Sequence, residues 1–128
     1  MSDHTVSLGL RAMLEPLLIN HSVDVFWSGH YHSYLRTAPV RNGTIAEDAE
    51  GFAQGTTHIC VGTAGIGFDS KDWYPRDWDR KHFSQVFAYG RTTLLNETAM
   101  RFELVDSLNG TILDSHVLRS NHNFPAWQ

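Results

Sequence analysis

The chain opens with a helical pattern of apolar residues. Between residues 7 and 20, large apolar side chains recur at intervals of three and four positions, the spacing of one face of an amphipathic helix. These side chains are Leu10, Met13, Leu14, Leu17 and Leu18. Ser7 stands at the expected N-cap, whereas Pro16 lies inside the pattern and predicts a kink or an interruption. We therefore expect a helix over residues 7–20 that is bent or broken at Pro16.

Strand-like runs follow this segment. Residues 23–27 and 58–61 have the apolar character of buried strands, and the second run leads into the glycine-rich residues 62–67. Residues 41–56 are polar and contain glycine, so we expect a surface loop there. A P-loop is not indicated at residues 62–67, because the Lys and Ser/Thr of that motif are missing and no clear helix follows.

The last third of the chain predicts an antiparallel sheet. Three strand-like runs cover residues 85–95, 99–105 and 111–117, and Asn109-Gly110 is a strong hairpin signal between the last two. Residues 119–128 read as a tail that must dock elsewhere or fray, which leaves residues 1–118 as the folded part. Taken alone, the pattern is that of an α+β piece with one N-terminal helix followed by mostly antiparallel strands.

Composition limits the size and class of the protein. A chain of 128 residues with 41% hydrophobic content makes one globular unit. The formal net charge is -4 and the basic residues are scattered, so a nucleic-acid partner is not expected. No apolar run is long enough to cross a membrane, and we recognise no signal peptide within the chain. The single cysteine, Cys60, excludes an internal disulfide and reads as a small buried apolar residue.

The sequence context of the asparagines indicates the cellular compartment of the protein. Four of the six asparagines open an Asn-x-Ser/Thr acceptor for N-glycosylation. They are Asn20, Asn42, Asn96 and Asn109. This number favours a secreted, extracellular or vacuolar-lysosomal glycoprotein, although the two Asn-Gly-Thr triplets also fit tight turns.

Two histidines form the strongest chemical signal. His30 and His32 follow the apolar run 23–27 directly and are preceded by Gly29. Because side-chain direction in an extended chain repeats every two residues, we expect these two imidazoles at the end of the strand to project to the same side, and the missing Cβ of Gly29 to let another backbone or an ion approach. Neutral imidazoles at such a junction are suited to a metal site.

A second segment gathers aromatic and basic side chains within residues 69–82. Its candidate substrate contacts are Trp73, Tyr74, Arg76 and His82. The alternative is a surface loop whose aromatic rings pack on the sheet, and this is the interpretation we prefer.

Residues 23–36 closely resemble the last metal-ligand motif of the purple acid phosphatases, members of the calcineurin-like metallophosphoesterases. That motif is an apolar strand, Gly-His-x-His, a small residue, and then Tyr, Glu and Arg; Leu35 stands here in place of the Glu. Three other segments are also similar to the family. They are the helix with its Glu15-Pro16 pair, the strand and glycine-rich turn of residues 58–65, and the start of the C-terminal hairpins at residues 87–91. The likeness covers nearly the whole chain.

The resemblance implies an α/β fold, in which this chain forms the C-terminal half of a metallophosphoesterase β-sandwich flanked by helices. It also implies a dinuclear centre of Fe with Zn, Mn or Fe that hydrolyses phosphoric monoesters through a metal-activated hydroxide. His30 would bind the divalent metal and His32 the ferric ion. The loss of a carboxylate at Leu35 puts the polarity around the metal ligands in question.

The ligand count argues against independent activity. Each metal needs about four to six donors, and the Gly-Asp and Gly-Asn-His motifs of the family do not precede His30. We therefore expect this chain to be the C-terminal portion of such a protein, without its N-terminal catalytic half. It would be inactive until that half or another chain completes the site. Two alternatives remain open: a non-catalytic, secreted β-rich glycoprotein or binding module, and a truncated product without independent function.

Overall fold

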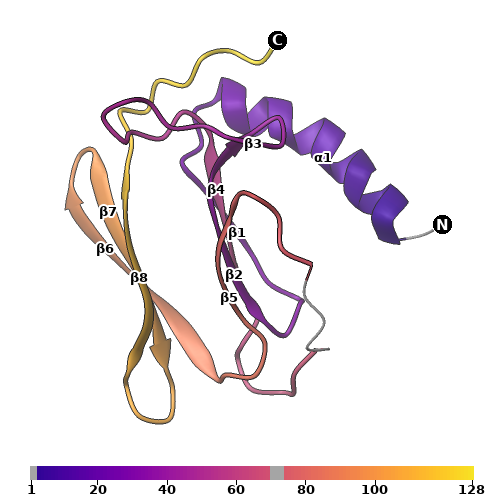
Figure 1. Ribbon diagram of the computed structural model, residues 1–128, viewed down its shortest axis with the longest axis vertical. Helices are drawn as coiled ribbons and strands as arrows, with labels where there is room; N and C mark the ends of the chain where they lie inside the picture. Colours follow the sequence, from indigo (N-terminus) through magenta and orange to yellow (C-terminus); the bar gives the residue numbers. More distant parts are fainter. Residues whose placement is uncertain (1–2, 70–73) are drawn as a thin grey trace.

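The computed structural model describes residues 3–69 and 74–128. Its one described helix, α1 (Asp3–Asn20), contains Pro16 and runs without interruption to the expected end (Figure 1). The predicted helix is confirmed, but it begins earlier than expected, so Ser7 lies within it and is not its N-cap. Among the described residues, no helix is long and apolar enough to cross a membrane.

The first sheet consists of five described strands. They are β1 (Val25–Ser28), β2 (Tyr34–Arg41), β3 (Thr44–Ile45), β4 (Thr56–Val61) and β5 (Asp79–Phe83). The order is β1-β4-β2-β3, and β5 also pairs with β2. Only the pairing of β1 with β4 is parallel among these described strands. The segment expected to be a loop thus contains the short strand β3 and the start of β4, while β2 and β5 were not predicted.

The second sheet is an antiparallel meander. It consists of β6 (Ala88–Asn96), β7 (Ala99–Asp106) and β8 (Ile112–Arg119). Gly110 has a φ of 76° in the turn between β7 and β8, a conformation that glycine adopts without strain. All three strands expected in the last third of the chain are confirmed, and so is the hairpin at Asn109-Gly110.

The core lies between the two sheets, which face each other in Figure 1. Its buried members are Tyr34, Ile59, Ala88, Phe102 and Leu104. The Tyr34 and Phe102 rings stack across the interface with centroids 6.0 Å apart and an interplanar angle of 9°. A Cβ atom on Gly90 would lie 2.9 Å from the Phe102 ring, so the absence of a side chain at this glycine leaves room for that ring. The expected β-sandwich with one preceding helix is therefore present.

The C-terminal tail docks on the end of α1. Phe124 is buried with Ile19 and Ala53 in a second small apolar cluster. Two backbone groups of the tail are also fixed, because the Phe124 N–H donates to Ser22 Oγ at 3.0 Å and the Trp127 N–H donates to Asn20 Oδ1 at 2.9 Å. The tail thereby ties the helix to the end of β8.

Candidate metal centre

His30 and His32 lie in the bend that connects β1 with β2. Strand β1 ends at Ser28, and His30 has a φ of 75°, in the left-handed region. The alternation of side chains along a strand therefore does not orient these imidazoles, and that part of the sequence argument is wrong. The position itself is as expected, because the bend follows the carboxyl end of β1.

Two contacts hold this histidine bend in place. The His32 N–H donates to Asp69 Oδ2 at 2.6 Å, and the Gly62 N–H donates to the Ser33 carbonyl at 3.0 Å. A Cβ atom on Gly62 would lie 1.5 Å from the Tyr31 carbonyl oxygen, a separation that no side chain allows. Gly29, by contrast, has open space around it. The close backbone approach expected at Gly29 therefore occurs at Gly62, where the glycine-rich turn meets the bend.

The described part of the chain supplies only a partial ligand set. Among the side chains that the structure describes, in residues 8–69 and 74–128, no group of three or more His, Cys, Asp or Glu is arranged to hold a metal ion. Imidazoles are suitable ligands for Fe, Zn and Mn, so His30 and His32 fit as contributors to a metal centre. They do not fit as its complete ligand shell.

Tyr34 and Arg36, which follow the bend in β2, join the two sheets through Asp114 of β8. Tyr34 Oη and Arg36 Nε each donate to Asp114 Oδ2 at 2.7 Å, and Arg36 Nη2 donates to Oδ1 at 3.0 Å. Burial raises the pKa of Asp114, but the hydrogen bonds from Arg36 and Tyr34 and the guanidinium charge outweigh it and hold that pKa below its usual value. The network fixes the strand that leaves the histidine bend.

Leu35 points to the opposite face of the first sheet from Tyr34 and Arg36, because side chains alternate along β2. It is paired in register with Cys60 on β4 and His82 on β5. Burial raises the pKa of the half-buried Cys60 thiol. Leu35, which stands where the family has Glu, therefore has the Cys60 thiol and the His82 imidazole as its neighbours on the adjacent strands.

The candidate substrate segment divides between a loop and a strand. Trp73 lies outside the described residues. Tyr74 is 81% exposed, and Arg76, also exposed, uses its backbone N–H to donate to Asp79 Oδ2 at 2.6 Å. His82 belongs to β5, where burial lowers its pKa and Asp79 partly offsets the effect. No contact brings Tyr74 or Arg76 to the histidine bend in the described part of the chain.

The four candidate glycosylation sites are all exposed: Asn20, Asn42, Asn96 and Asn109. Asn42 has a φ of 49° and precedes Gly43 in the β2–β3 turn. The Asn96 and Asn109 side chains accept hydrogen bonds from the backbone N–H groups of Thr98 and Thr111, at 2.9 and 2.8 Å. These asparagines therefore also serve as turn residues.

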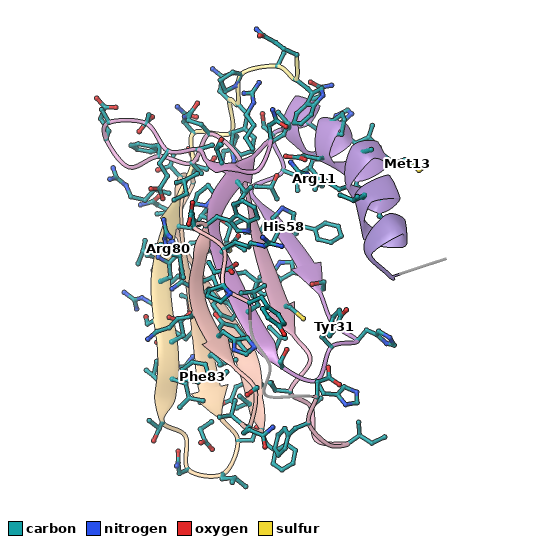
Figure 2. The ribbon with its side chains drawn as sticks, turned by 45° about the vertical axis from the view of Figure 1, so that its right-hand side comes forward. Arg11, Met13, Tyr31, His58, Arg80 and Phe83 are labelled. Atoms are coloured by element: carbon teal, nitrogen blue, oxygen red, sulfur yellow. The ribbon has the colours of Figure 1, made fainter. Side chains whose placement is uncertain are left out.

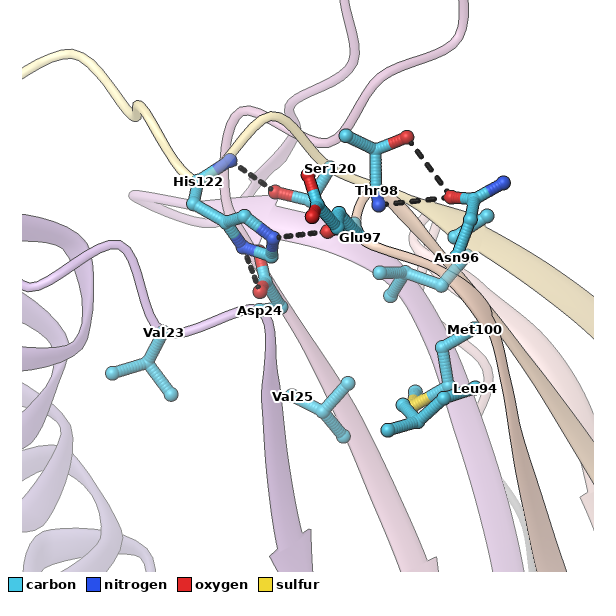
Figure 3. Close-up of a pocket in the computed structure, with 12 residues that line it drawn as sticks. Val23, Asp24, Val25, Leu94, Asn96, Glu97, Thr98, Met100, Ser120 and His122 are labelled. Carbon is cyan, nitrogen blue, oxygen red and sulfur yellow. Dashed lines mark hydrogen bonds and ion pairs between the residues drawn. The ribbon is translucent and has the colours of Figure 1, made fainter.

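A pocket of about 330 Å³ opens near the start of β1, away from the histidine bend. Figure 3 shows His122 at its rim, where the ring bridges Asp24 and the β6–β7 turn. His122 Nδ1 lies 2.6 Å from Asp24 Oδ2, and Nε2 lies 2.8 Å from the Glu97 carbonyl. The Glu97 carbonyl and the Asp24 carboxylate both raise the pKa of His122, because each accepts a hydrogen bond from the charged ring.

Sequence reasoning missed both of these polar clusters. The sequence assigned no role to His122 or to Asp114. The hydrogen-bonded partners are 98 residues apart in the first case and 78 and 80 in the second. No local pattern marks such pairs.

Comparisons with known proteins agree with the architecture. The family profile described as "Iron/zinc purple acid phosphatase-like protein C" matches residues 55–115. An acid phosphatase from Aspergillus ficuum is 30% identical over 125 residues, which cover 87% of this chain and 20% of that protein. A probable inactive purple acid phosphatase 27 from Arabidopsis thaliana is 28% identical over 114 residues, 84% of this chain and 18% of the relative.

A solved structure has the same fold. A purple acid phosphatase from seeds of yellow lupin (Lupinus luteus) superposes with a TM-score of 0.75 at 22% sequence identity, over 90% of this chain and 22% of the lupin chain. The chain thus spans about a fifth of the length of the relatives that it matches. The chain resembles the purple acid phosphatase-like proteins and is similar to their C-terminal portion.

Proposed function

We propose that this chain supplies His30 and His32 to the dinuclear metal centre of an acid phosphatase acting on phosphoric monoesters. The observation that carries the proposal is the histidine bend itself, which lies at the carboxyl end of β1 and is fixed by Asp69 and Gly62. The acid phosphatase relatives support the reaction class. The resemblance assigns the divalent metal to His30 and the ferric ion to His32.

The residues of this chain hold and orient the ligands. Asp69 accepts the backbone N–H of His32 and so restrains the second imidazole, while the absence of a side chain at Gly62 lets the bend close on the glycine turn. His30 and His32 would each supply one ring nitrogen as a metal ligand. A metal pair held by His30, His32 and further donors would supply Lewis acidity, which would polarise a phosphate and lower the pKa of an attacking water.

The residues that the structure describes do not bring together most of the donors that two metals require. We therefore propose that the 128-residue chain alone has no appreciable phosphatase activity. Further donors supplied by another polypeptide, or by sequence joined to this chain, would be required. A secreted or vacuolar-lysosomal setting is part of the proposal, supported by the exposure of all four acceptor asparagines.

Metal analysis of the purified chain, together with turnover of p-nitrophenyl phosphate, tests this proposal. We expect weak binding of Zn²⁺ or Fe³⁺ below two ions per chain, weaker binding in His30→Ala and His32→Ala, and no turnover. His21→Ala is the matched control, because His21 is an exposed histidine in the turn before β1. Two tightly bound ions with steady hydrolysis would contradict the incompleteness of the site, and binding that is indifferent to both bend variants would contradict the ligand assignment.

A further inference from the structure

The pocket near the start of β1 has an apolar floor. Four apolar side chains from the two sheets line it there: Val25, Leu94, Met100 and Leu118. Gly90 faces the Phe102 ring of the core, so the alternation of side chains along β6 directs Leu94 toward the same side of the second sheet. Leu94 is nevertheless 79% exposed, so the described part of the chain leaves space beside it.

Two carboxylates stand beside this floor, and neither is fully partnered. Glu97 lines the pocket from the β6–β7 turn, and no described residue forms a hydrogen bond or ion pair with its carboxylate. Asp24 Oδ1 is buried and has no hydrogen-bond partner in the same part of the chain. A buried carboxylate oxygen without a donor is costly, so a donor brought by a ligand would stabilise it.

His122 supplies a positive charge at the rim of the pocket. Its two ring nitrogens face acceptors, with Nδ1 2.6 Å from Asp24 Oδ2 and Nε2 2.8 Å from the Glu97 carbonyl. Both nitrogens can donate only when the imidazole is doubly protonated. Among the described residues that line the pocket, Asp24, Glu97 and His122 are the titratable ones, and none is Lys or Arg. Once His122 loses its proton, the pocket therefore has a net negative charge.

The pocket is separate from the candidate metal centre. Figure 2 shows Tyr31 of the histidine bend beyond the carboxyl end of β1, whereas the yellow C-terminal tail, which includes His122, lies at the opposite end of the sheets. The residues that line the pocket include none from the bend. A ligand of this pocket would therefore be bound apart from His30 and His32.

We propose that the pocket binds a small organic cation, in which an ammonium group is carried on an apolar body, as in an arylalkylamine. Asp24 and Glu97 would hold the ammonium group, and the apolar body would cover Leu94 and Met100. A volume of about 330 Å³ is at the small end of ligand sites, which fits one ring on a short chain. Charge complementarity selects a cation over an anion or a neutral molecule of the same shape. The inference does not depend on the proposed function, because it uses no metal ligand.

Titration of the 128-residue chain with 2-phenylethylamine, followed by heteronuclear NMR, tests the site. At pH 8.5 we expect saturable shifts at Thr98 and Met100 with a dissociation constant of about 1 mM or lower. The neutral isostere 2-phenylethanol should bind at least about fivefold more weakly, because it lacks the charge that meets the carboxylates. At pH 5 the amine should bind about threefold more weakly than at pH 8.5, because the His122 imidazolium then competes for Asp24.

Two variants assign the effect to the pocket. Glu97→Gln should weaken binding of the amine at least about threefold and leave binding of the alcohol unchanged. Glu47→Gln is the matched control, because Glu47 is an exposed carboxylate after β3 that does not line the pocket. His122→Asn should remove the difference between the two pH values.

Each of the other outcomes would overturn the inference. They are the absence of saturable shifts below about 10 mM amine, equal affinities for the amine and the alcohol, and shifts confined to the histidine bend. Glu97→Gln indistinguishable from Glu47→Gln would exclude the carboxylate contact. An affinity of the parent chain that is equal at both pH values would exclude competition by His122 for Asp24.

Discussion

Replacing Asp114 by Asn tests whether one buried carboxylate holds the two sheets together. The side chains of Asp114 and Arg36 are 3% and 7% exposed, so the ion pair is shielded from water. Asparagine has nearly the same shape and keeps one acceptor oxygen, but it removes the charge that balances the guanidinium. The substitution therefore isolates the electrostatic part of the network from its packing.

The magnitude follows from burial and hydrogen bonding. Asp114 accepts three hydrogen bonds, from Tyr34 Oη, Arg36 Nε and Arg36 Nη2. Removing one partner of a buried ion pair costs about 3 to 5 kcal/mol, because the other charge is left without compensation. Single domains are stable by only about 5 to 15 kcal/mol, so Asp114→Asn should remove a large part of the stability of this chain.

Urea denaturation followed by circular dichroism measures the effect through the shift in midpoint. Arg91→Gln is the control, because the Arg91–Glu103 pair has a similar separation of 3.0 Å but the Arg91 side chain is 50% exposed, and its loss should cost less than about 1 kcal/mol. If Asp114→Asn does not fold, the double variant Arg36→Met/Asp114→Leu provides the measurement, since it removes both charges and should be more stable than either single charge loss. The reasoning would be refuted if Asp114→Asn lay within about 1 kcal/mol of the parent chain.

Three further predictions concern pH and the histidine bend. Because the folded pKa of Asp114 is depressed from 3.8, its stabilisation is present above that value and should disappear as the pH falls through the folded pKa; acid titration of the parent chain against Asp114→Asn measures the difference. The folded pKa of His122 is raised from 6.5, so the Asp24–His122 pair should stabilise the fold fully below that pH and lose its effect as the pH rises through the folded pKa. An NMR titration of the His122 ring, with the stability of His122→Asn as reference, checks this, and a variant with unchanged pH dependence would argue against it. Gly62→Ala should destabilise the chain by about 3 kcal/mol through a backbone clash, whereas Gly29→Ala, which meets open space, should cost less than about 1 kcal/mol; equal denaturation midpoints for the two variants would contradict the close approach.

Local sequence signals predicted the elements that depend on neighbouring residues. The α1 helix follows from apolar spacing, and the last hairpin follows from Asn109-Gly110, whose conformations favour a tight turn. Strand β2 was not predicted, and it contains Pro39, a residue that ordinarily argues against a strand. In the structure, Pro39 lies at a register shift in the pairing of β2 with β4, where the ladder is already irregular.

Strand β5 was missed for a different reason. Its sequence, Asp79–Phe83, is mostly charged or polar and has little intrinsic strand character. It becomes a strand because β2 offers an edge, where residues 34–37 pair with it in register. Such pairing is a property of the assembled sheet and leaves no local mark.

The candidate metal centre also has some features that the sequence predicted and others that depend on the folded structure. His30 and His32 were identified from their spacing and the motif around them, and the comparisons support the family to which the motif belongs. The contact of Asp69 with the bend and the close approach at Gly62 depend on segments that meet only after folding. The local argument from strand alternation was wrong because β1 ends before His30.

The sequence by itself determined the helix, the final meander and the family-specific pair of histidines, because each is encoded by residues close together in the chain. Tertiary structure decided which groups surround those histidines and which surfaces are left open. It joined Tyr34 and Arg36 to Asp114, turned the apolar face of α1 outward and, among the described strands, paired β1 with β4 alone. The physical reason is that hydrogen bonding and burial between distant segments depend on how the sheets pack, which local spacing does not specify.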